Sequence, residues 1–255
     1  MSSAVPRSFA VLDLLVGEIA GLPLGEIATR LDLPKSAAHR VLTELVQLGY
    51  LIQDRATGHY VLGLRLVSQA LRHLASIPVV DLAKPLLDRI AHRSGELVRL
   101  GLQDGDDSLV WVAKAQGARS GLRFDPDDGR EIKLARSSSG LAWLSTLPPG
   151  RAEALVRRQG FDDIDRYGPD GARDVAEAME EVRRAREQGY AWTESTFELG
   201  GAVLAVPIGT AGRPAVGTLS IAGPQIRWTR ERAQEILPDL RAASDELVAL
   251  LEVGP

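Results

Sequence analysis

Apolar residues recur at helical spacing in three stretches near the N-terminus. The first stretch predicts a helix from Arg7 to Ile19, ended by Gly21 and Pro23. Its apolar positions are Phe9, Leu12, Leu15, Val16 and Ile19. A short second helix has Ile27, Ala28 and Leu31 facing inward. After the turn Asp32-Leu33-Pro34, a third helix starts with Pro34 in its first position and runs to about Leu48, which predicts a helix-turn-helix.

The third helix has two different faces. At about 100° per residue, its apolar residues cluster on one side; these are Ala38, Val41, Leu42, Leu45 and Leu48. The opposite side carries hydrogen-bonding residues, namely Lys35, Ser36, His39, Arg40, Thr43 and Gln47. Such side chains contact phosphates and base edges in DNA grooves. A polar face turned to solvent is the alternative, since sequences that only look like a helix-turn-helix are common.

A short hairpin is predicted directly after this helix. Tyr50–Gln53 and His59–Leu62 are apolar segments joined by a turn that contains Asp54 and Gly58. A hairpin in this place forms the wing of a winged helix-turn-helix. Arg55 at its tip can reach a phosphate or the minor groove. An ordinary turn with a solvated arginine is the alternative.

The next helix is predicted to connect two domains. It runs from Leu64 to Ala75, and Ile77-Pro78 ends it. Its apolar stripe consists of Leu64, Val67, Leu71 and Leu74. A helical linker transmits orientation between domains, and we expect the stripe to pack on a partner subunit.

Strands and helices alternate in the second part of the chain. A helix capped by Asp81 and ending near His92 precedes strand-like segments at 97–102, 109–115, 122–124 and 132–134, with a turn at 127–130. Helices then follow from Ser137 and over 152–159 and 175–188, and strands over 191–197, 202–208 and 216–222. The last helix, 229–252, contains Pro238, where we expect a kink. This order predicts an α+β sensor domain with an antiparallel sheet.

The run Ser137-Ser138-Ser139-Gly140 is a candidate anion site. Backbone N–H groups at a helix start favour an anion, and small residues allow it to approach. Simple N-capping by a serine is the alternative. The acidic run from Asp125 is not a calcium loop, because its sixth residue is Arg130 and its twelfth is Arg136.

Composition limits the chemistry that the chain can perform. It has no cysteine, and its four histidines lack metal-ligand spacing. It also has no Gly-x-Ser-x-Gly elbow and no Gly-rich phosphate loop. The net charge is −4, whereas residues 1–76 carry seven Lys/Arg and six Asp/Glu. DNA binding must therefore depend on where the charges lie, not on bulk charge. With neither a signal peptide nor an apolar run of membrane length, we expect a cytoplasmic protein without membrane association.

Several motifs resemble one family along nearly the whole chain. LPKSAAHRVLTELVQLGYL followed by TGHYVLGLRL resembles the winged helix-turn-helix of the IclR family of bacterial transcriptional regulators. LARSSSGLAWL, EEVRRAREQGYA and the pair AVLAVPI and GTLSIAGP resemble the effector-binding domain of that family. The resemblance implies a homodimer or homotetramer, a palindromic DNA operator, and a GAF-like ligand domain that alters DNA binding.

The resemblance also implies the position of the ligand pocket. Backbone amides at Ser138 and Ser139, beside Gly140, would anchor the ligand. Thr193, Val203 and Ala222 stand where the family usually has an acidic residue, a cysteine and a serine, and the usual serine is kept at Ser220. Because three polar side chains are missing, we expect a larger and flatter, aromatic acid rather than a small keto acid. Trp143 and Trp192 are candidate walls of the pocket, with core packing as the alternative.

The sequence thus predicts a ligand-responsive regulator with three parts. These are a DNA-binding domain over 1–63, a linker helix over 64–78 and an effector-binding domain over 79–255. We expect a repressor that needs no cofactor and has no catalytic residue. A small-molecule enzyme with an accessory winged domain is one alternative, and a protein-interaction module is another.

Overall fold

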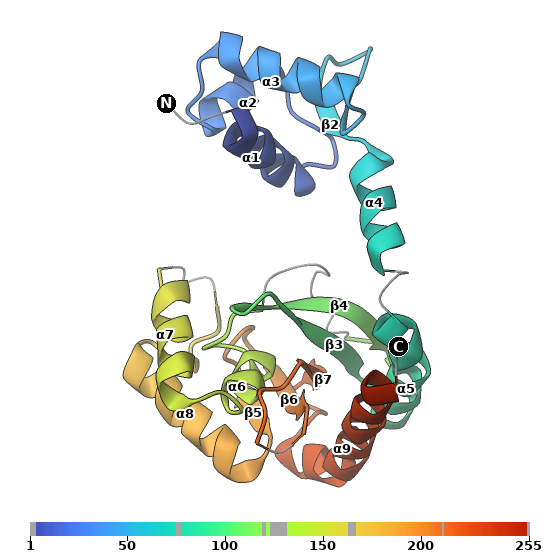
Figure 1. The fold of residues 1–255 in the computed structure, drawn as a ribbon, viewed down its shortest axis with the longest axis vertical. Helices are drawn as coiled ribbons and strands as arrows, with labels where there is room; N and C mark the ends of the chain where they lie inside the picture. Colours follow the sequence, from blue (N-terminus) through green and yellow to red (C-terminus); the bar gives the residue numbers. More distant parts are fainter. Residues whose placement is uncertain are drawn as a thin grey trace. The chain divides into compact units, whose positions relative to one another are not determined.

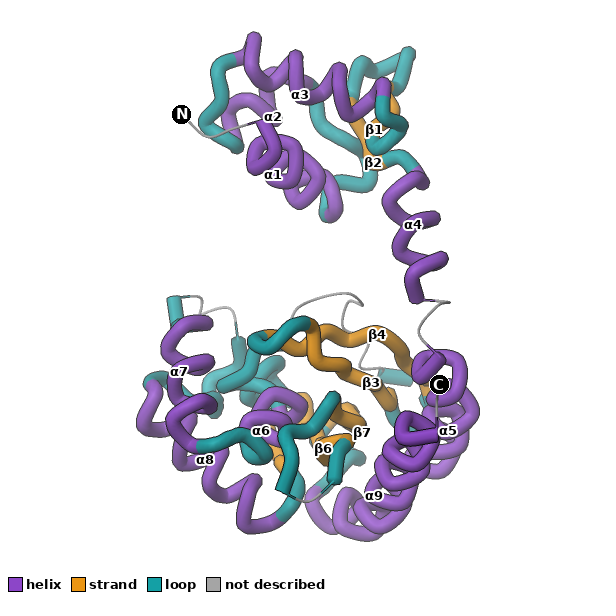
Figure 2. The backbone as a smooth tube through the Cα atoms, in the orientation of Figure 1, coloured by secondary structure: helices purple, strands orange, loops and turns teal. Residues whose placement is uncertain are grey.

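The computed structural model describes residues 4–74, 78–118, 121–122, 132–162, 167–210 and 212–253. The chain divides into two compact units, Met1–Ser76 and Ile77–Pro255. Each unit has its own hydrophobic core. Figures 1 and 2 show a mostly helical first unit, and a second unit in which helices flank the strands.

Three helices and a hairpin form the core of the first unit. Helices α1 (Ala4–Val16), α2 (Leu24–Arg30) and α3 (Lys35–Gln47) precede strands β1 (Leu51–Gln53) and β2 (Tyr60–Leu62). The two strands pair antiparallel, with Ile52 opposite Val61. The buried residues of the helices include Val11, Leu12 and Leu15 from α1 and the predicted Ala38, Val41, Leu42 and Leu45 from α3. The predicted helix-turn-helix and wing are therefore present.

Several details of the first unit differ from the sequence-based expectation. Helix α1 ends at Val16, earlier than predicted, and Ile19 in the turn that follows is 96% exposed. Gly21, with φ +70°, comes at the end of this turn. Phe9, Val16 and Leu48 are also exposed. Pro34 is the N-cap of α3 rather than its first helical residue, with an extended ψ of 135°.

Helix α4 (Leu64–Leu74) follows the hairpin. Of its predicted apolar stripe, Leu64, Val67 and Leu71 are exposed in the single chain. At the start of the helix, Arg65 donates a hydrogen bond to the Leu48 carbonyl and lies over the Tyr50 ring. These contacts fix the beginning of α4 to the segment between α3 and β1.

The second unit is built on one antiparallel five-stranded sheet in the order β4-β3-β7-β6-β5. The strands are β3 (Leu97–Asp104), β4 (Ser108–Gln116), β5 (Ala191–Glu194), β6 (Gly201–Ile208) and β7 (Gly217–Pro224). Successive side chains of a strand point to opposite faces of a sheet. The sheet thus has two faces, and different helices cover them. The fold is α+β, as predicted.

Helices α5 (Pro78–Ser94) and α9 (Arg230–Val253) pack side by side on one face, here called the α5/α9 face (Figure 1). Its sheet residues include Val98, Leu100, Leu204 and Ile221. The other face, here called the α6 face, is covered by α6 (Ser138–Leu144). Helices α7 (Pro149–Gln159) and α8 (Val175–Gln188) pack beside α6 on that side.

Some element boundaries in the second unit were predicted wrongly. Residues 132–134 form no strand, although the Ile132 N–H donates to the Leu109 carbonyl. Asp81 lies in the first turn of α5 rather than at its N-cap, and α7 begins already at Pro149. Helix α9 is not interrupted at Pro238, and the kink expected at that residue stays a prediction. The predicted turn at 127–130 lies outside the described residues, as does most of the strand expected at 122–124.

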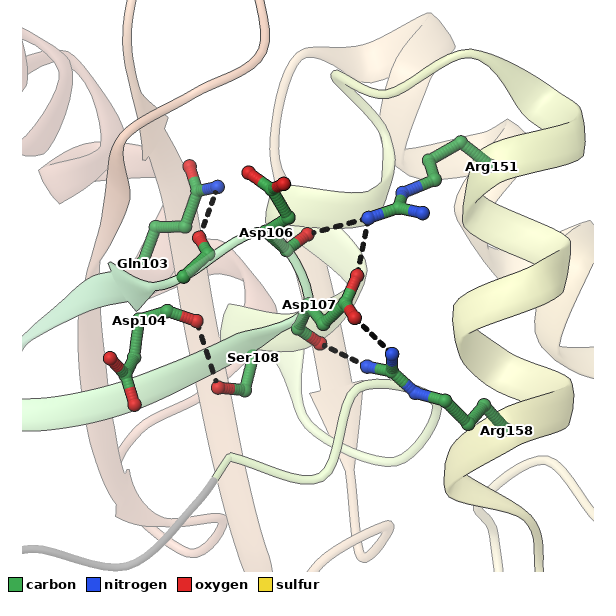
Figure 3. Close-up of polar contacts among 8 residues, drawn as sticks. Gln103, Asp104, Asp106, Asp107, Ser108, Arg151 and Arg158 are labelled. Carbon is green, nitrogen blue, oxygen red and sulfur yellow. Dashed lines mark hydrogen bonds and ion pairs between the residues drawn. The ribbon is translucent and has the colours of Figure 1, made fainter.

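The turn between β3 and β4 is tied to helix α7 by a charged cluster (Figure 3). Arg151 and Arg158 on α7 both form ion pairs with the Asp107 carboxylate. They also donate to the carbonyls of Asp106 and Asp107, at 3.0 and 3.2 Å respectively. The hydrogen bond from Arg158, with the charges of both arginines, lowers the pKa of Asp107 below its ordinary value of 3.8.

Candidate functional site: a DNA-reading helix and a buried effector site

The exposed face of α3 carries the predicted DNA-contacting residues. Lys35, Ser36, His39, Arg40 and Thr43 are all exposed, and the opposite face of α3 is buried against α1 and α2. The Thr43 hydroxyl donates to the His39 carbonyl at 2.8 Å, so its oxygen is left to act as an acceptor. The helix therefore presents a row of hydrogen-bonding groups on a rigid base.

Several cationic side chains of the first unit differ in what they contact. Arg30 forms ion pairs with Glu18 and Glu26, and Arg65 is held by the Leu48 carbonyl. These two side chains stabilise the fold. Lys35, Arg40 and Arg55 are exposed, and they are the cations that the sequence assigned to DNA.

The wing holds Arg55 in a defined turn. One Asp54 carboxylate oxygen accepts the N–H groups of Ala56 and Thr57, both at 2.8 Å, and the Thr57 hydroxyl at 3.1 Å. The backbone hydrogen bonds from Thr57 and Ala56 lower the pKa of Asp54. Gly58, with φ +73°, completes the turn. Arg55 is therefore displayed at the tip of an ordered hairpin.

Most of the predicted effector residues share the α6 face of the sheet. Thr193, Val203 and Ala222 lie side by side on β5, β6 and β7 in direct register. Ser220 is two residues from Ala222 on β7 and faces the same way. The Ser138 hydroxyl joins this group through hydrogen bonds of 2.7 Å with the Thr193 hydroxyl and 2.8 Å to the Val203 carbonyl.

The start of α6 differs from an open anion site. The Ser137 side chain caps the helix by accepting the Gly140 N–H at 3.0 Å. A Cβ atom at Gly140 would lie 2.3 Å from the Leu134 carbonyl oxygen, so this glycine allows close packing of two backbone segments. Ser138 and Ser139 are both buried. The geometry thus gives Gly140 a packing role and favours N-capping by Ser137.

The two candidate tryptophans lie away from this group. Trp143 is fully buried in the core between α6, α7 and α8, and its indole N–H donates to the Ala215 carbonyl at 2.9 Å. Trp192 precedes Thr193 on the same strand and therefore faces the α5/α9 side, where its ring lies 6.3 Å from that of Trp228. Core packing, the alternative given above, describes both positions.

Two adjoining hollows lie along the edge strand β5. Their volumes are about 190 and 180 Å³, and they share Leu141, Glu181, Arg184, Trp192 and Arg230. Of the predicted effector residues, only Trp192 and Thr193 line them. Arg136 borders one hollow and donates to the carbonyls of Ala172 and Gly168, at 2.8 and 2.6 Å. This arginine therefore fastens the loop beside α6.

Sequence reasoning missed three polar residues on the α6 face. Arg99, Trp111 and Thr218 are buried there, on β3, β4 and β7. The Arg99 guanidinium carbon lies 3.9 Å from the centre of a Trp111 ring. The available signal was an arginine inside the apolar run Leu97-Val98-Arg99-Leu100, since a charged residue is rarely buried without a specific partner.

The described residues hold no cluster of three or more His, Asp or Glu arranged for a metal ion. Within the same parts of the chain, no helix has both the length and the apolar character needed to cross a membrane.

Comparison with known families decides the identity of the two units. The model "Bacterial transcriptional regulator IclR C-terminal" matches residues 71–249, and "IclR helix-turn-helix domain" matches residues 4–55. The chain belongs to the IclR family. Its two units are therefore the helix-turn-helix and effector-binding domains of an IclR-family regulator, as the motifs indicated.

Two curated relatives agree with this family assignment, and a solved structure has the same fold. The chain is 26% identical to the HTH-type transcriptional regulator KipR of Bacillus subtilis, over 95% of this chain and 94% of KipR. It is 25% identical to the transcriptional repressor IclR of Escherichia coli, over 91% and 84% of the two chains. An IclR homologue from Microbacterium hydrocarbonoxydans, solved with 4-hydroxybenzoate, superposes with a TM-score of 0.78 at 24% identity, covering 99% of this chain and all of the other.

These relatives are named as regulators and not as enzymes. The enzyme alternative is therefore set aside, and this IclR-family chain is a ligand-responsive transcriptional regulator.

Proposed function

We propose that this regulator is a repressor that binds a palindromic operator as a homo-oligomer and responds to a small aromatic acid. The observation that carries the DNA-binding part is the exposed face of α3. It combines Lys35, Ser36, His39, Arg40 and Thr43 on one side of a helix whose other side is fixed in the core. Arg40 is the candidate for base reading, and Lys35 and Arg55 for phosphate contacts.

A homo-oligomer is supported by charge and by exposed apolar surface. Residues 1–76 have a net charge of only +1, so that a single copy attracts DNA weakly. Leu64, Val67 and Leu71 form an exposed apolar stripe on α4 that a second copy can cover. Two copies related by a twofold axis would place their α3 helices in successive major grooves, about 34 Å apart. Repression accords with the name of the E. coli relative, which is a transcriptional repressor.

The effector class is supported by the composition of the α6 face. Val203 and Ala222 contribute no side-chain hydrogen bonds there, which disfavours a small hydroxylated acid. The Microbacterium homologue is described in complex with 4-hydroxybenzoate, an aromatic acid. We therefore place the effector on the α6 face, near Ser138, Thr193 and Ser220.

A DNA-binding titration tests this function. The full chain is titrated onto labelled DNA from upstream of its own gene and onto unrelated DNA of equal length. Replacing Arg40 by Ala is expected to weaken upstream binding about 5- to 150-fold, because an arginine paired with guanine contributes ~1–3 kcal/mol. Binding to unrelated DNA should change much less.

Arg213→Ala is the matched control, since Arg213 is an exposed arginine of the second unit. It should leave both affinities unchanged. An equal loss of affinity on both DNAs for Arg40→Ala would assign Arg40 to the phosphate backbone. Absence of preferential binding to the upstream DNA would contradict the proposed operator.

A further inference from the structure

Three buried polar atoms on the α6 face have no hydrogen-bond partner among the described residues. They are Ser220 Oγ, Trp111 Nε1 and Thr218 Oγ1, and each residue is at least 97% buried. Leaving a buried donor or acceptor unsatisfied costs free energy, so such atoms in a native fold require an explanation. Trp111 on β4 and Thr218 on β7 lie on either side of Gly101 of β3, which each of them pairs with. The three atoms therefore occur within one region of the sheet.

The buried side chain of Arg99 lies within this region. Arg99 is 4% exposed, and it lies directly opposite Ser220 on β7 and Lys114 on β4. Its guanidinium is stacked on Trp111, and stacking fixes the plane of the group. A planar guanidinium also matches a carboxylate in a two-point hydrogen bond.

The neighbouring row of the same face is apolar. Leu97, Val203 and Ala222 form a small buried cluster, two residues along the strands from Arg99 and Ser220. Two residues of a strand span roughly 6.8 Å, a length comparable to that of one aromatic ring. The face thus offers a cationic and hydrogen-bonding row beside a flat apolar row.

We propose that Arg99 and Ser220, rather than the start of α6, bind the carboxylate of an aromatic monocarboxylic acid whose ring lies on Leu97, Val203 and Ala222. This inference rests on the proposed effector site and names its anchor and ligand class. The Trp111 N–H lies beside Arg99 and serves as a further donor to the anion. At the α6 start, the Ser137 side chain caps the Gly140 N–H, and the Ser138 hydroxyl is bonded to Thr193 and Val203, so neither hydroxyl serves as the anchor.

Calorimetry on the full chain tests the anchor with benzoate, benzamide and acetate as probes. Benzamide keeps the ring without the charge, and acetate keeps the charge without the ring. Benzoate is expected to bind at least about 30-fold more tightly than benzamide, since loss of one partner of a buried charged pair has an effect of this size. It should also bind more tightly than acetate, which buries no ring on the apolar row. This comparison needs no variant and does not depend on how a variant folds.

Two variants locate the anchor. Arg99→Gln should weaken benzoate binding at least about 30-fold, and Ser220→Ala about 5-fold, with no change in benzamide binding. Arg186→Gln is the matched control, because Arg186 on α8 donates to the carbonyls of Ser145 and Leu147, away from the proposed anchor. It should keep the wild-type affinity for benzoate. Thermal melting of each variant separates loss of binding from loss of folding.

The outcomes distinguish the anchor from the function. Failure of the wild type to bind benzoate, equal binding of benzamide, or unchanged affinity in a folded Arg99→Gln or Ser220→Ala protein overturns the anchor. If another compound then alters operator binding, the proposed effector response stands and only the anchor fails. Benzoate binding that depends on Arg99, in a protein with no preference for its upstream DNA, supports the anchor and contradicts the proposed operator.

Discussion

Replacing Gly140 tests whether the start of α6 packs closely against the backbone of Leu134. A Cβ atom there would lie 2.3 Å from the Leu134 oxygen and 2.4 Å from the Leu134 Cα. Both are backbone atoms, so no side-chain rotation can relieve the overlap. Overpacking costs about 1–3 kcal/mol and occasionally more, whereas replacing Gly by Ala inside a helix gains about 1 kcal/mol. At this short distance the cost lies at the upper end of that range, and after the helical gain is subtracted Gly140→Ala should lower the free energy of unfolding by about 2 kcal/mol.

Denaturant unfolding followed by tryptophan fluorescence measures this loss. All four tryptophans belong to the second unit, so their emission reports the effector-binding domain. Gly150→Ala on α7 is the control, because a Cβ there meets nothing within 4 Å. That variant should be as stable as the wild type or up to about 1 kcal/mol more stable. An unchanged denaturation midpoint for Gly140→Ala would show that a methyl group fits at this position. Gly140 would then keep its predicted role beside a ligand.

Three further predictions follow from the described contacts. Because the pKa of Asp107 is lowered in the folded chain, its ionised carboxylate stabilises the fold at neutral pH, and this contribution is lost as the pH falls below about 4. Asp107→Asn should therefore reduce the fall in melting temperature at acid pH. A melting temperature that depends on pH as in the wild type would contradict a stabilising role for the cluster. Trp192→Leu should leave benzoate affinity unchanged by calorimetry, whereas a large loss would place Trp192 in the effector site. Leu71→Glu should shift the sedimentation of the full chain towards the monomer without lowering its melting temperature, and an unchanged oligomer would exclude the α4 stripe as the interface.

The architecture was largely readable from periodicity, because a buried helix face and a buried strand leave different apolar patterns. Ala38, Val41, Leu42 and Leu45 were assigned to the core correctly for this reason. Periodicity cannot tell a face buried in the chain from one left exposed, which is why Phe9 was misplaced. It also failed at residues 132–134, where the apolar Ile132 fills the space above Gly101 without belonging to a strand.

The effector site was predictable only in part. The resemblance to the family pointed to Thr193, Val203, Ser220 and Ala222, and the register of the strands brings them onto one face. Trp192 could have been set apart from Thr193 from sequence, since adjacent strand residues face opposite ways. Arg99 required the structure, because only the pairing of β3 with β7 places it beside Ser220.

Operator affinity with and without benzoate tests the central claim most directly. The full chain is titrated onto labelled upstream DNA by fluorescence anisotropy at fixed salt, with benzoate or benzamide at saturating concentration. For a repressor released by an aromatic acid, benzoate should weaken operator binding at least about 10-fold, a coupling of ~1.4 kcal/mol between the two sites. Benzamide should have no effect. An operator affinity that is the same with benzoate, with benzamide and with neither would contradict the account.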